Sequence, residues 1–254
     1  MDSTTVKALR IIEALSASDD ERGVSELSRQ VRLTKSNTFR ILSTLVDQGY
    51  VQSNPETSRY FLTLKIWEQG TRVMDRNPIR RVARPHLQAL FAKINETILV
   101  SVLDLPNVLY IEKIESDNPV RASARVGQRA PALRAASGKS ILAFYPNETI
   151  EQYATQGIGN KTDVMQFQNE LSQIRERGYA ISISGSRPGV NSIAAPIWGG
   201  QMVPSGALSV SGPAERCTLK YLQGISSVIV NASTLISESL GVSSPTIGNF
   251  AFVD

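Results

Sequence analysis

The sequence predicts an α+β protein in two parts, an N-terminal winged helix-turn-helix and a larger C-terminal domain built on an antiparallel sheet. Three observations predict this division. Residues 1–63 contain three short amphipathic segments followed by a polar hairpin sequence. Asn77-Pro78 interrupts a helical pattern and marks a domain boundary. Beyond that point, strand-like segments are mixed with helices without regular β-α-β alternation, which favours an antiparallel sheet.

Composition limits the class of protein. Of the 254 residues, 41% are hydrophobic and 20% are charged, as in an ordinary globular protein. The single cysteine, Cys217, excludes an internal disulfide and a cysteine-rich zinc site, and fits a reducing compartment. No apolar run approaches the roughly 18 residues of a membrane span, and the N-terminal segment MDSTTVKALR lacks the order of a secretion signal. We therefore expect a cytoplasmic protein with no membrane partner, no metal and no cofactor.

Positive charge is concentrated in short stretches, while the formal net charge of the chain is only +4. Residues 22–40 hold five Lys or Arg against one acid, Glu26. Residues 76–95 and 121–139 each hold five basic residues and no acid. Local basic patches matter more than net charge for contact with nucleic acid. The stretch at 22–40 is therefore a candidate contact surface.

Two short helices joined by a tight connection form the expected helix-turn-helix. A first helix precedes them and places its apolar side chains on one face, namely Val6, Leu9, Ile12 and Leu15. After a loop through Gly23, Ser25 is expected to be the N-cap of a second helix that ends near Val31. Arg32-Leu33 then leads directly into a third helix.

The stretch from Thr34 to Gln48 predicts the third helix, whose two faces differ in kind. Its apolar face is formed by Thr38, Ile41, Leu42 and Leu45. Its polar face carries donors or mixed donor–acceptor groups and no carboxylate, namely Lys35, Ser36, Asn37, Arg40, Ser43 and Thr44. Surface helices normally mix both signs of charge, so a face without acids favours an anionic partner. A solvated surface helix is the alternative on this stretch alone.

A β-hairpin follows the third helix, which is expected to end near Gly49. Residues 50–52 and 59–62 are strand-like and flank a polar turn that contains Pro55. Three helices followed by such a hairpin make a winged helix-turn-helix. Arg59 then lies where a wing strand could touch the DNA backbone.

This arrangement predicts that the third helix enters the major groove of a double-stranded DNA operator. The predicted DNA contacts are Ser25, Lys35, Ser36, Asn37, Thr38, Phe39, Arg40, Ser43 and Arg59. Lys35, Asn37 and Arg40 are the expected base or phosphate contacts. Ser25 and Arg59 would contact the DNA backbone. Phe39 is expected to pack against a thymine methyl group, and Thr38 to be shared between packing and groove entry.

Residues 64–77 are expected to form a linker helix between the two domains. Trp67 is large for the surface of so small a domain. We therefore expect this helix to pack against a second subunit. The alternative is ordinary packing of Trp67 onto its own domain.

The C-terminal domain, residues 78–254, is expected to open with a long amphipathic helix. Its predicted strands are 98–103, 108–114, 120–126, 179–184, 191–197 and 206–211. Residues 127–133 are expected to be a loop. The remaining predicted helices are 135–145, 147–156, 163–177 and 215–240.

Several motifs occur in order along the chain: LTKSNTFRIL at 33–42, RVG at 125–127 leading to ASGKSILA at 136–143, PGVNSIAAP at 188–196, and GALSVSGP at 206–213. In order and spacing, over almost the whole chain, they resemble the IclR family of bacterial transcription regulators. The resemblance implies a DNA-binding domain, a linker helix and a GAF-like effector-binding domain. It also implies homodimers, commonly paired into tetramers, that respond to small metabolites. We expect a repressor rather than an activator.

Carried over position by position, the resemblance implies a pocket for a small effector. Its implied members are Ala130, Leu133, Ala136, Ser137, Ser182, Ser192, Ser209 and Ser211. Ala136 and Ser137 would offer backbone amides at the start of a helix, which suit an anion. Many members of the family have an acid in the run that spans residues 182–187 here. The loss of that acid and the presence of Arg187 favour an anionic ligand, and we expect an organic acid as effector. The alternatives are that Arg187 faces solvent and that the strand backbone satisfies the serine hydroxyl groups.

No enzyme site emerges from the sequence. Gly138-Lys139-Ser140 would need a glycine five residues earlier to form a phosphate-binding loop, and Leu133 stands there. Nucleophilic catalysis would need a base, and the single histidine, His86, lies on a basic helix with no nearby Asp. A ligand-sensing protein whose winged helix contacts another protein remains the alternative of a different class. The scarcity of acids on the third helix disfavours it.

Overall fold

The structure is a computed structural model that describes residues 3–158 and 161–242. The outer bounds of the two predicted domains, residues 1 and 254, lie outside the described residues. Two compact units divide the chain between Arg76 and Asn77. The helix expected as a linker, α4 (Lys65–Asp75), falls within the first unit, and its assignment as a separate linker stays a prediction.

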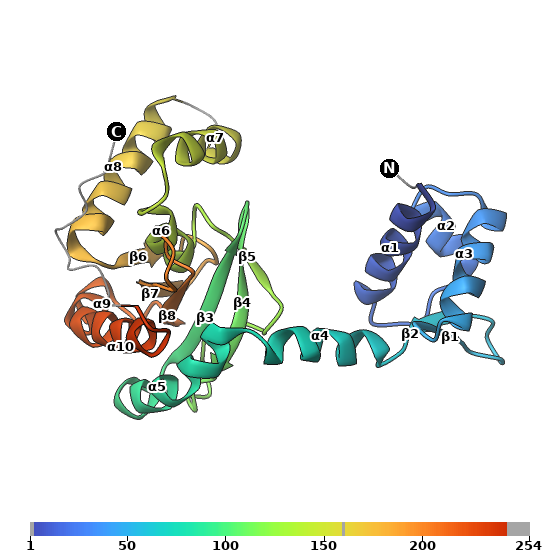
Figure 1. Cartoon of the computed structure of the whole chain (residues 1–254), viewed down its shortest axis with the longest axis horizontal. Helices are drawn as coiled ribbons and strands as arrows, with labels where there is room; N and C mark the ends of the chain where they lie inside the picture. Colours follow the sequence, from blue (N-terminus) through green and yellow to red (C-terminus); the bar gives the residue numbers. More distant parts are fainter. Residues whose placement is uncertain (1–2, 159–160, 243–254) are drawn as a thin grey trace. The chain divides into compact units, whose positions relative to one another are not determined.

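The first unit is a winged helix-turn-helix, as predicted (Figure 1). Its elements are α1 (Ser3–Ser16), α2 (Val24–Gln30), α3 (Lys35–Asp47), β1 (Val51–Ser53) and β2 (Tyr60–Leu62). Strands β1 and β2 pair antiparallel, and Arg22 in the α1–α2 loop forms an isolated bridge with Tyr60. The core between the helices is apolar and includes the fully buried side chains of Ile11, Leu27 and Leu42.

Helix ends in this unit follow local capping. Helix α2 begins at Val24 with Gly23 as its N-cap, so the prediction that Ser25 caps it is wrong. Glu26 is the third helical residue and its carboxylate accepts a hydrogen bond from the Gly23 amide at 3.4 Å, which moves the helix start upstream. At the end of α3, Gly49 has φ +72°. This left-handed position confirms the predicted glycine cap.

Helix α4 buries none of its own residues in the first unit. Its apolar residues are among the most exposed in the described chain, namely Leu64 just before it, Trp67 and Val73. The side chain of Trp67 is 71% exposed. The alternative that Trp67 packs onto its own domain is therefore wrong.

The second unit has one antiparallel sheet of six strands among the described residues, in the order β5-β4-β3-β8-β7-β6. The strands are β3 (Thr97–Asp104), β4 (Asn107–Ile114), β5 (Arg129–Pro131), β6 (Ala180–Ile183), β7 (Val190–Ile197) and β8 (Gly206–Pro213). The helices are α5 (Pro78–Ile94), α6 (Ala136–Leu142), α7 (Asn147–Ile158), α8 (Lys161–Arg177), α9 (Leu219–Gly224) and α10 (Ser226–Ser239). Helix α6 covers one face of β7 and β8, and α10 covers the other (Figure 1). The predicted α+β class is confirmed.

Two predictions in this unit are wrong. Residues 120–126 do not form a strand, and β5 lies instead within the predicted loop. The valines that mimicked a strand pattern there are largely exposed, Val120 by 68% and Val126 by 49%, so they mark no core face. The expected long final helix is two helices, because Thr218 caps α9 and the first helix ends at Gly224.

Candidate DNA interface and ligand pocket

Helix α3 presents the two faces that the sequence indicated. Thr34 caps the helix by accepting a hydrogen bond from the Asn37 amide at 3.3 Å. The buried face is formed by Thr38, Ile41, Leu42 and Leu45. The opposite face exposes Lys35, Ser36, Phe39 and Arg40, with Asn37 and Ser43 half-buried. The phenyl ring of Phe39 is 54% exposed on a polar face, where it is available to a partner.

Thr38 does not belong to the outward face. Its side chain is 0% exposed, and its hydroxyl group donates to the Thr34 carbonyl at 3.0 Å. The prediction that Thr38 contacts DNA is therefore wrong. Its spacing with Ile41, Leu42 and Leu45 already placed it on the apolar face, and that signal was the stronger one.

Three cations on α2 and α3 have no acid partner among the described residues, namely Arg29, Lys35 and Arg40. Arg40 Nη2 lies 3.5 Å from Asn37 Oδ1, the limit for a hydrogen bond. Arg29 Nε donates to the Ser25 carbonyl at 3.2 Å. Within residues 3–158 and 161–242, no carboxylate pairs with Arg29, Lys35 or Arg40. Their charges are available to an external anion.

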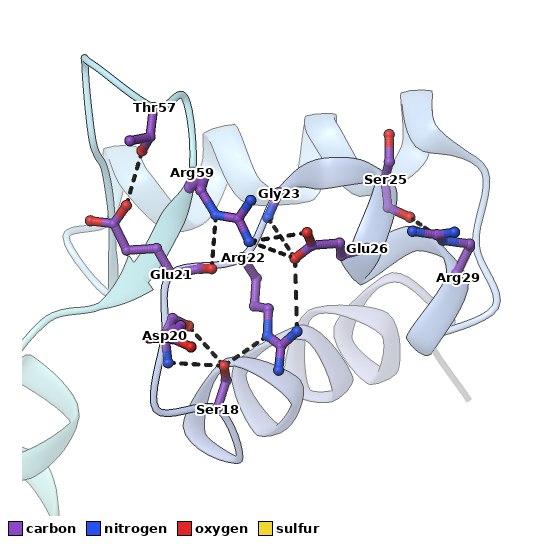
Figure 2. A network of polar contacts seen from close by, with 10 residues as sticks. All are labelled: Ser18, Asp20, Glu21, Arg22, Gly23, Ser25, Glu26, Arg29, Thr57 and Arg59. Carbon is purple, nitrogen blue, oxygen red and sulfur yellow. Dashed lines mark hydrogen bonds and ion pairs between the residues drawn. The ribbon is translucent and has the colours of Figure 1, made fainter.

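Arg59 differs from these cations because it is bound inside the domain (Figure 2). Its Nε donates to the Glu21 carbonyl at 3.0 Å, and its Nη2 lies 3.0 and 2.9 Å from the two carboxylate oxygens of Glu26. Burial would raise the pKa of Glu26, but the Gly23 amide and the Arg59 and Arg22 guanidinium groups outweigh it, and the pKa is lowered. Nothing in the sequence singled out Glu21, and a contact of Arg59 with DNA stays a prediction.

Most of the effector residues implied by the resemblance share one face of the sheet. Ser182, Ser192 and Ser211 are cross-strand partners on β6, β7 and β8. Ser209 pairs with Ala194 and Leu99. Partners in register point to the same face of a sheet. All four serines therefore lie on the face covered by α6, together with Ala130 on β5 through its pairing with Val108.

The hydroxyl groups of these serines differ in whether they form hydrogen bonds. Ser182 donates to the Arg134 carbonyl at 2.7 Å, and Ser209 lies 3.4 Å from the Leu99 carbonyl. For these two residues the backbone-satisfied alternative holds. Ser192 and Ser211 are 8% and 9% exposed, and no hydrogen bond of either hydroxyl is found among the described residues.

A cavity of about 90 Å³ opens beside Ser211. Its wall includes Leu99, Tyr110, Ala130 and Arg187. The structure thus brings Ala130 and Ser211 together, and Arg187 reaches the cavity. Six expected residues do not line it, namely Leu133, Ala136, Ser137, Ser182, Ser192 and Ser209.

Besides Ser211 and Arg187, the cavity wall has polar groups that the sequence did not single out, among them Tyr110. Arg187 Nη1 donates to the Ser123 carbonyl and so connects the β6–β7 loop to the segment before β5. Burial raises the pKa of Tyr110, an effect that the Arg187 charge reduces, so this phenol stays protonated at neutral pH. Nearby, Ser101 Oγ is buried and has no hydrogen-bond partner among the residues that the structure describes. Ser101 pairs with Ala207 and Tyr110 on the same face.

Helix α6 begins deep in the domain. Ala136 and Ser137, its first residues, are buried. A Cβ at Gly138 would lie 2.2 Å from the Ala132 carbonyl oxygen, so only glycine lets the helix approach the chain after β5 this closely. The Gly-Lys-Ser run therefore has a packing explanation.

The described residues show no group of three His, Cys, Asp or Glu that could hold a metal ion. Burial and the nearby Glu96 raise the pKa of Cys217 to about 12, with Arg216 opposing them, so the thiol is protonated and a poor nucleophile. Over the same ranges, none of the helices has the length and apolar character needed to cross a bilayer.

Comparison with known proteins matches both units. Residues 4–55 match the IclR helix-turn-helix domain, and residues 71–238 match the bacterial transcriptional regulator IclR C-terminal domain. The HTH-type transcriptional regulator KdgR of Escherichia coli K12 is 31% identical over 246 residues, which cover 94% of this chain and 93% of KdgR.

Solved structures share the fold. The Thermotoga maritima IclR structure is similar with a TM-score of 0.74 at 27% identity, over 95% of this chain and 100% of that one. An IclR homologue from Microbacterium hydrocarbonoxydans, crystallised with 4-hydroxybenzoate, is similar with a TM-score of 0.79 at 23% identity, over 94% and 99%.

Proposed function

Because the chain belongs to the IclR family of bacterial DNA-binding transcriptional regulators, we propose that it is a cytoplasmic repressor whose operator binding is modulated by a small organic anion. Its relatives are transcriptional regulators and not enzymes. The observation that carries the DNA-binding part is the outward face of α3, where Lys35 and Arg40 have no carboxylate partner among the described residues.

Helix α3 reads the operator from the major groove. Lys35, Asn37 and Arg40 contact base edges or phosphates, because their donors are exposed or half-exposed along one face. Phe39 packs against a thymine methyl group. The other outward contacts, to the DNA backbone, are Ser25, Ser36 and Ser43.

Helix α4 mediates homodimer formation, and dimers pair into tetramers. The support is the exposed apolar set of Leu64, Trp67 and Val73, which the first unit leaves uncovered. Two reading heads on a dimer recognise a pseudo-palindrome, with half-sites about one helical turn or a multiple apart. The effector shifts the population of dimers whose heads match that spacing.

The cavity beside Ser211 accepts the carboxylate of the effector. Arg187 supplies the positive charge, and the Tyr110 and Ser211 hydroxyl groups supply donors. Known ligand pockets run from about 300 to 1,000 Å³. The cavity of about 90 Å³ is smaller than these, so it limits the effector to a small acid unless it widens. An aromatic acid such as the 4-hydroxybenzoate seen with the Microbacterium homologue requires the Arg187–Ser123 contact to open.

Two experiments on the full chain test the proposal. Selection from a pool of random duplexes should enrich a pseudo-palindromic sequence, and failure to enrich any sequence would contradict sequence-specific binding. A thermal-shift screen of acetate, pyruvate, benzoate and 4-hydroxybenzoate should raise the melting temperature with at least one of them, because a ligand stabilises the folded state by mass action. The corresponding neutral amides are the control, and an equal shift with an amide would contradict the anionic class.

A further inference from the structure

The wing is fastened to the helix-turn-helix core through the loop between α1 and α2. The Arg22 amide donates to the Tyr60 carbonyl at 2.9 Å, and the Tyr60 amide donates to the Arg22 carbonyl at 2.8 Å. The residue before this bridge is Glu21. Its side chain points toward the wing tip, where it meets Thr57 (Figure 2).

The Glu21 carboxylate holds the wing tip itself. It accepts hydrogen bonds from Asn54 Nδ2 at 2.9 and 3.1 Å and from Thr57 Oγ1 at 2.9 Å. Asn54 Oδ1 in turn accepts from the amides of Glu56 and Thr57 at 2.9 and 3.4 Å. The tip is thus closed on itself by Asn54 and tied to the core by Glu21, 33 residues earlier in the chain.

A second carboxylate holds the wing strand. Glu26 binds the Arg59 guanidinium, which also donates to the Glu21 carbonyl. Arg22 lies 3.8 Å from Glu26 and donates from Nε to Ser18 Oγ at 2.7 Å. Two positive and two negative groups therefore meet in this network, namely Arg22, Arg59, Glu21 and Glu26, and their formal charges cancel.

Because the charges of this network cancel, the wing offers, among its described residues, no unpaired Lys or Arg that could bind a phosphate. The turn at residues 53–58 contains Glu56 and no Lys or Arg, and the nearest wing cation, Arg59, is paired with Glu26. As long as Arg59 stays paired with Glu26, any contribution of the wing to DNA binding comes from its hydroxyl and amide groups. Such neutral contacts depend on position, because hydrogen bonds weaken steeply when distance and angle depart from the optimum.

We propose that Glu21 is a positioning residue for DNA binding, which holds the wing tip through Asn54 and Thr57 while Glu26 holds Arg59. The inference rests on DNA binding by this domain. Two effects of the Glu21 carboxylate oppose each other. Its charge repels phosphates, although at a range screened to about 8 Å in physiological salt, while its hydrogen bonds fix the tip. The second effect is the larger.

Glu21→Gln separates the two effects, because it removes the charge and replaces one of the two acceptor oxygens that face Asn54 and Thr57 with an amide donor. Charge alone predicts tighter DNA binding, since a negative group is lost. Positioning predicts weaker binding, with a Kd raised roughly 3- to 10-fold for the loss of charge-assisted hydrogen bonds. The measurement is fluorescence anisotropy of the full chain with the duplex that the wild-type chain selects from a random pool.

Glu56→Gln is the matched control. It removes one negative charge from the wing tip that Glu21 contacts, but the Glu56 side chain accepts no hydrogen bond in the described structure. Its Kd should be unchanged or slightly lower. Thr57→Val is a milder variant that deletes one hydrogen bond to Glu21, and its Kd should rise about twofold.

The dependence on salt distinguishes positioning from phosphate contact. The slope of log Kobs against log salt reports the number of phosphates neutralised, so Glu21→Gln and Arg59→Gln should keep the wild-type slope. A second readout is independent of DNA. Amide hydrogen exchange at Glu56 and Thr57 should accelerate in Glu21→Gln while exchange in α3 does not change.

Several results would overturn the inference. One is Glu21→Gln binding the duplex as tightly as the wild type or more tightly. Another is unchanged exchange in the wing tip. In Arg59→Gln, a slope of log Kobs against log salt that is shallower by about one for each DNA-binding domain would show that Arg59 neutralises a phosphate. If the wild-type chain selects no duplex, DNA binding itself fails and the role of the wing fails with it.

Discussion

The outward face of α3 and the inner face of the C-terminal sheet use similar side chains in opposite ways. On α3, Lys35 and Arg40 point outward and meet no carboxylate among the described residues. On the sheet, Ser182 and Ser209 point inward and donate to backbone carbonyls of neighbouring segments. A polar group on an exposed helix is free by default, whereas one inside a domain is free only if its neighbours leave it so.

The largest expected effect comes from removing an exposed cation of α3. Arg40→Ala should cost about 1–3 kcal/mol of specific binding if the guanidinium group reads a base. Anisotropy titrations with the selected duplex and with a scrambled duplex measure this difference. Thr44→Ala, on the same helix, is the control. The Thr44 hydroxyl group already donates to the Arg40 carbonyl within α3, so its loss should change DNA affinity little. Equal affinity of Arg40→Ala and wild type for the selected duplex would remove Arg40 from the interface.

The next effect concerns the cavity. Arg187→Gln should weaken binding of the best organic acid about 10-fold, or ~1.4 kcal/mol, because the charge opposite the carboxylate is lost. Isothermal titration calorimetry of the full chain measures it, and DNA affinity without the acid should not change. Arg84→Gln is the matched control, since Arg84 is exposed on α5 and does not line the cavity. An unchanged acid affinity in Arg187→Gln would move the anion site elsewhere.

Two serines on the same face should differ in stability. Ser182→Ala removes the donor to the Arg134 carbonyl and should lower the free energy of unfolding by about 1 kcal/mol. Ser192→Ala should be nearly neutral, because no hydrogen bond of its hydroxyl is found among the described residues. Urea denaturation of both variants checks this difference. Equal losses would show that the two hydroxyl groups are equally engaged.

The smallest effect is a dependence on pH in the first unit. The pKa of Glu26 is lowered in the folded chain from an ordinary value of 4.5. Its contribution to stability is therefore complete above that value and is lost as pH falls through the lower folded pKa. Thermal melts at acidic pH should show this loss in the wild type and less of it in Glu26→Gln. Identical acid profiles would contradict the pairing of Glu26 with Arg59.

The two faces of α3 could be largely predicted because they depend on the spacing within one helix. The spacing of Ile41, Leu42 and Leu45 fixes which side is buried, and the rest of the helix follows. The sequence pattern is compatible with Thr38 on either side, and its complete burial places it in the core. The role of Arg59 could not be predicted, because its partners Glu21, in the α1–α2 loop, and Glu26, on α2, lie 33 or more residues earlier in the chain.

The inner site was harder to predict for the same reason. The resemblance placed serines on the correct strands, and the register brings them to one face. Which hydroxyl groups are free depends on the Arg134 and Leu99 carbonyls, whose positions no local pattern reveals. The cavity wall also includes Tyr110, on a strand that the motifs do not cover.

The most direct test of the account is the salt dependence of DNA binding by the full chain. Log Kobs for the selected duplex, measured by anisotropy between about 50 and 200 mM salt, should fall steeply and linearly with log salt as counterions are released. Lys35→Ala should make the slope shallower by about 0.9 for each phosphate that the variant no longer neutralises, while Glu21→Gln should not change it. A flat dependence on salt in the wild-type chain would contradict DNA binding through the unpaired cations of α3.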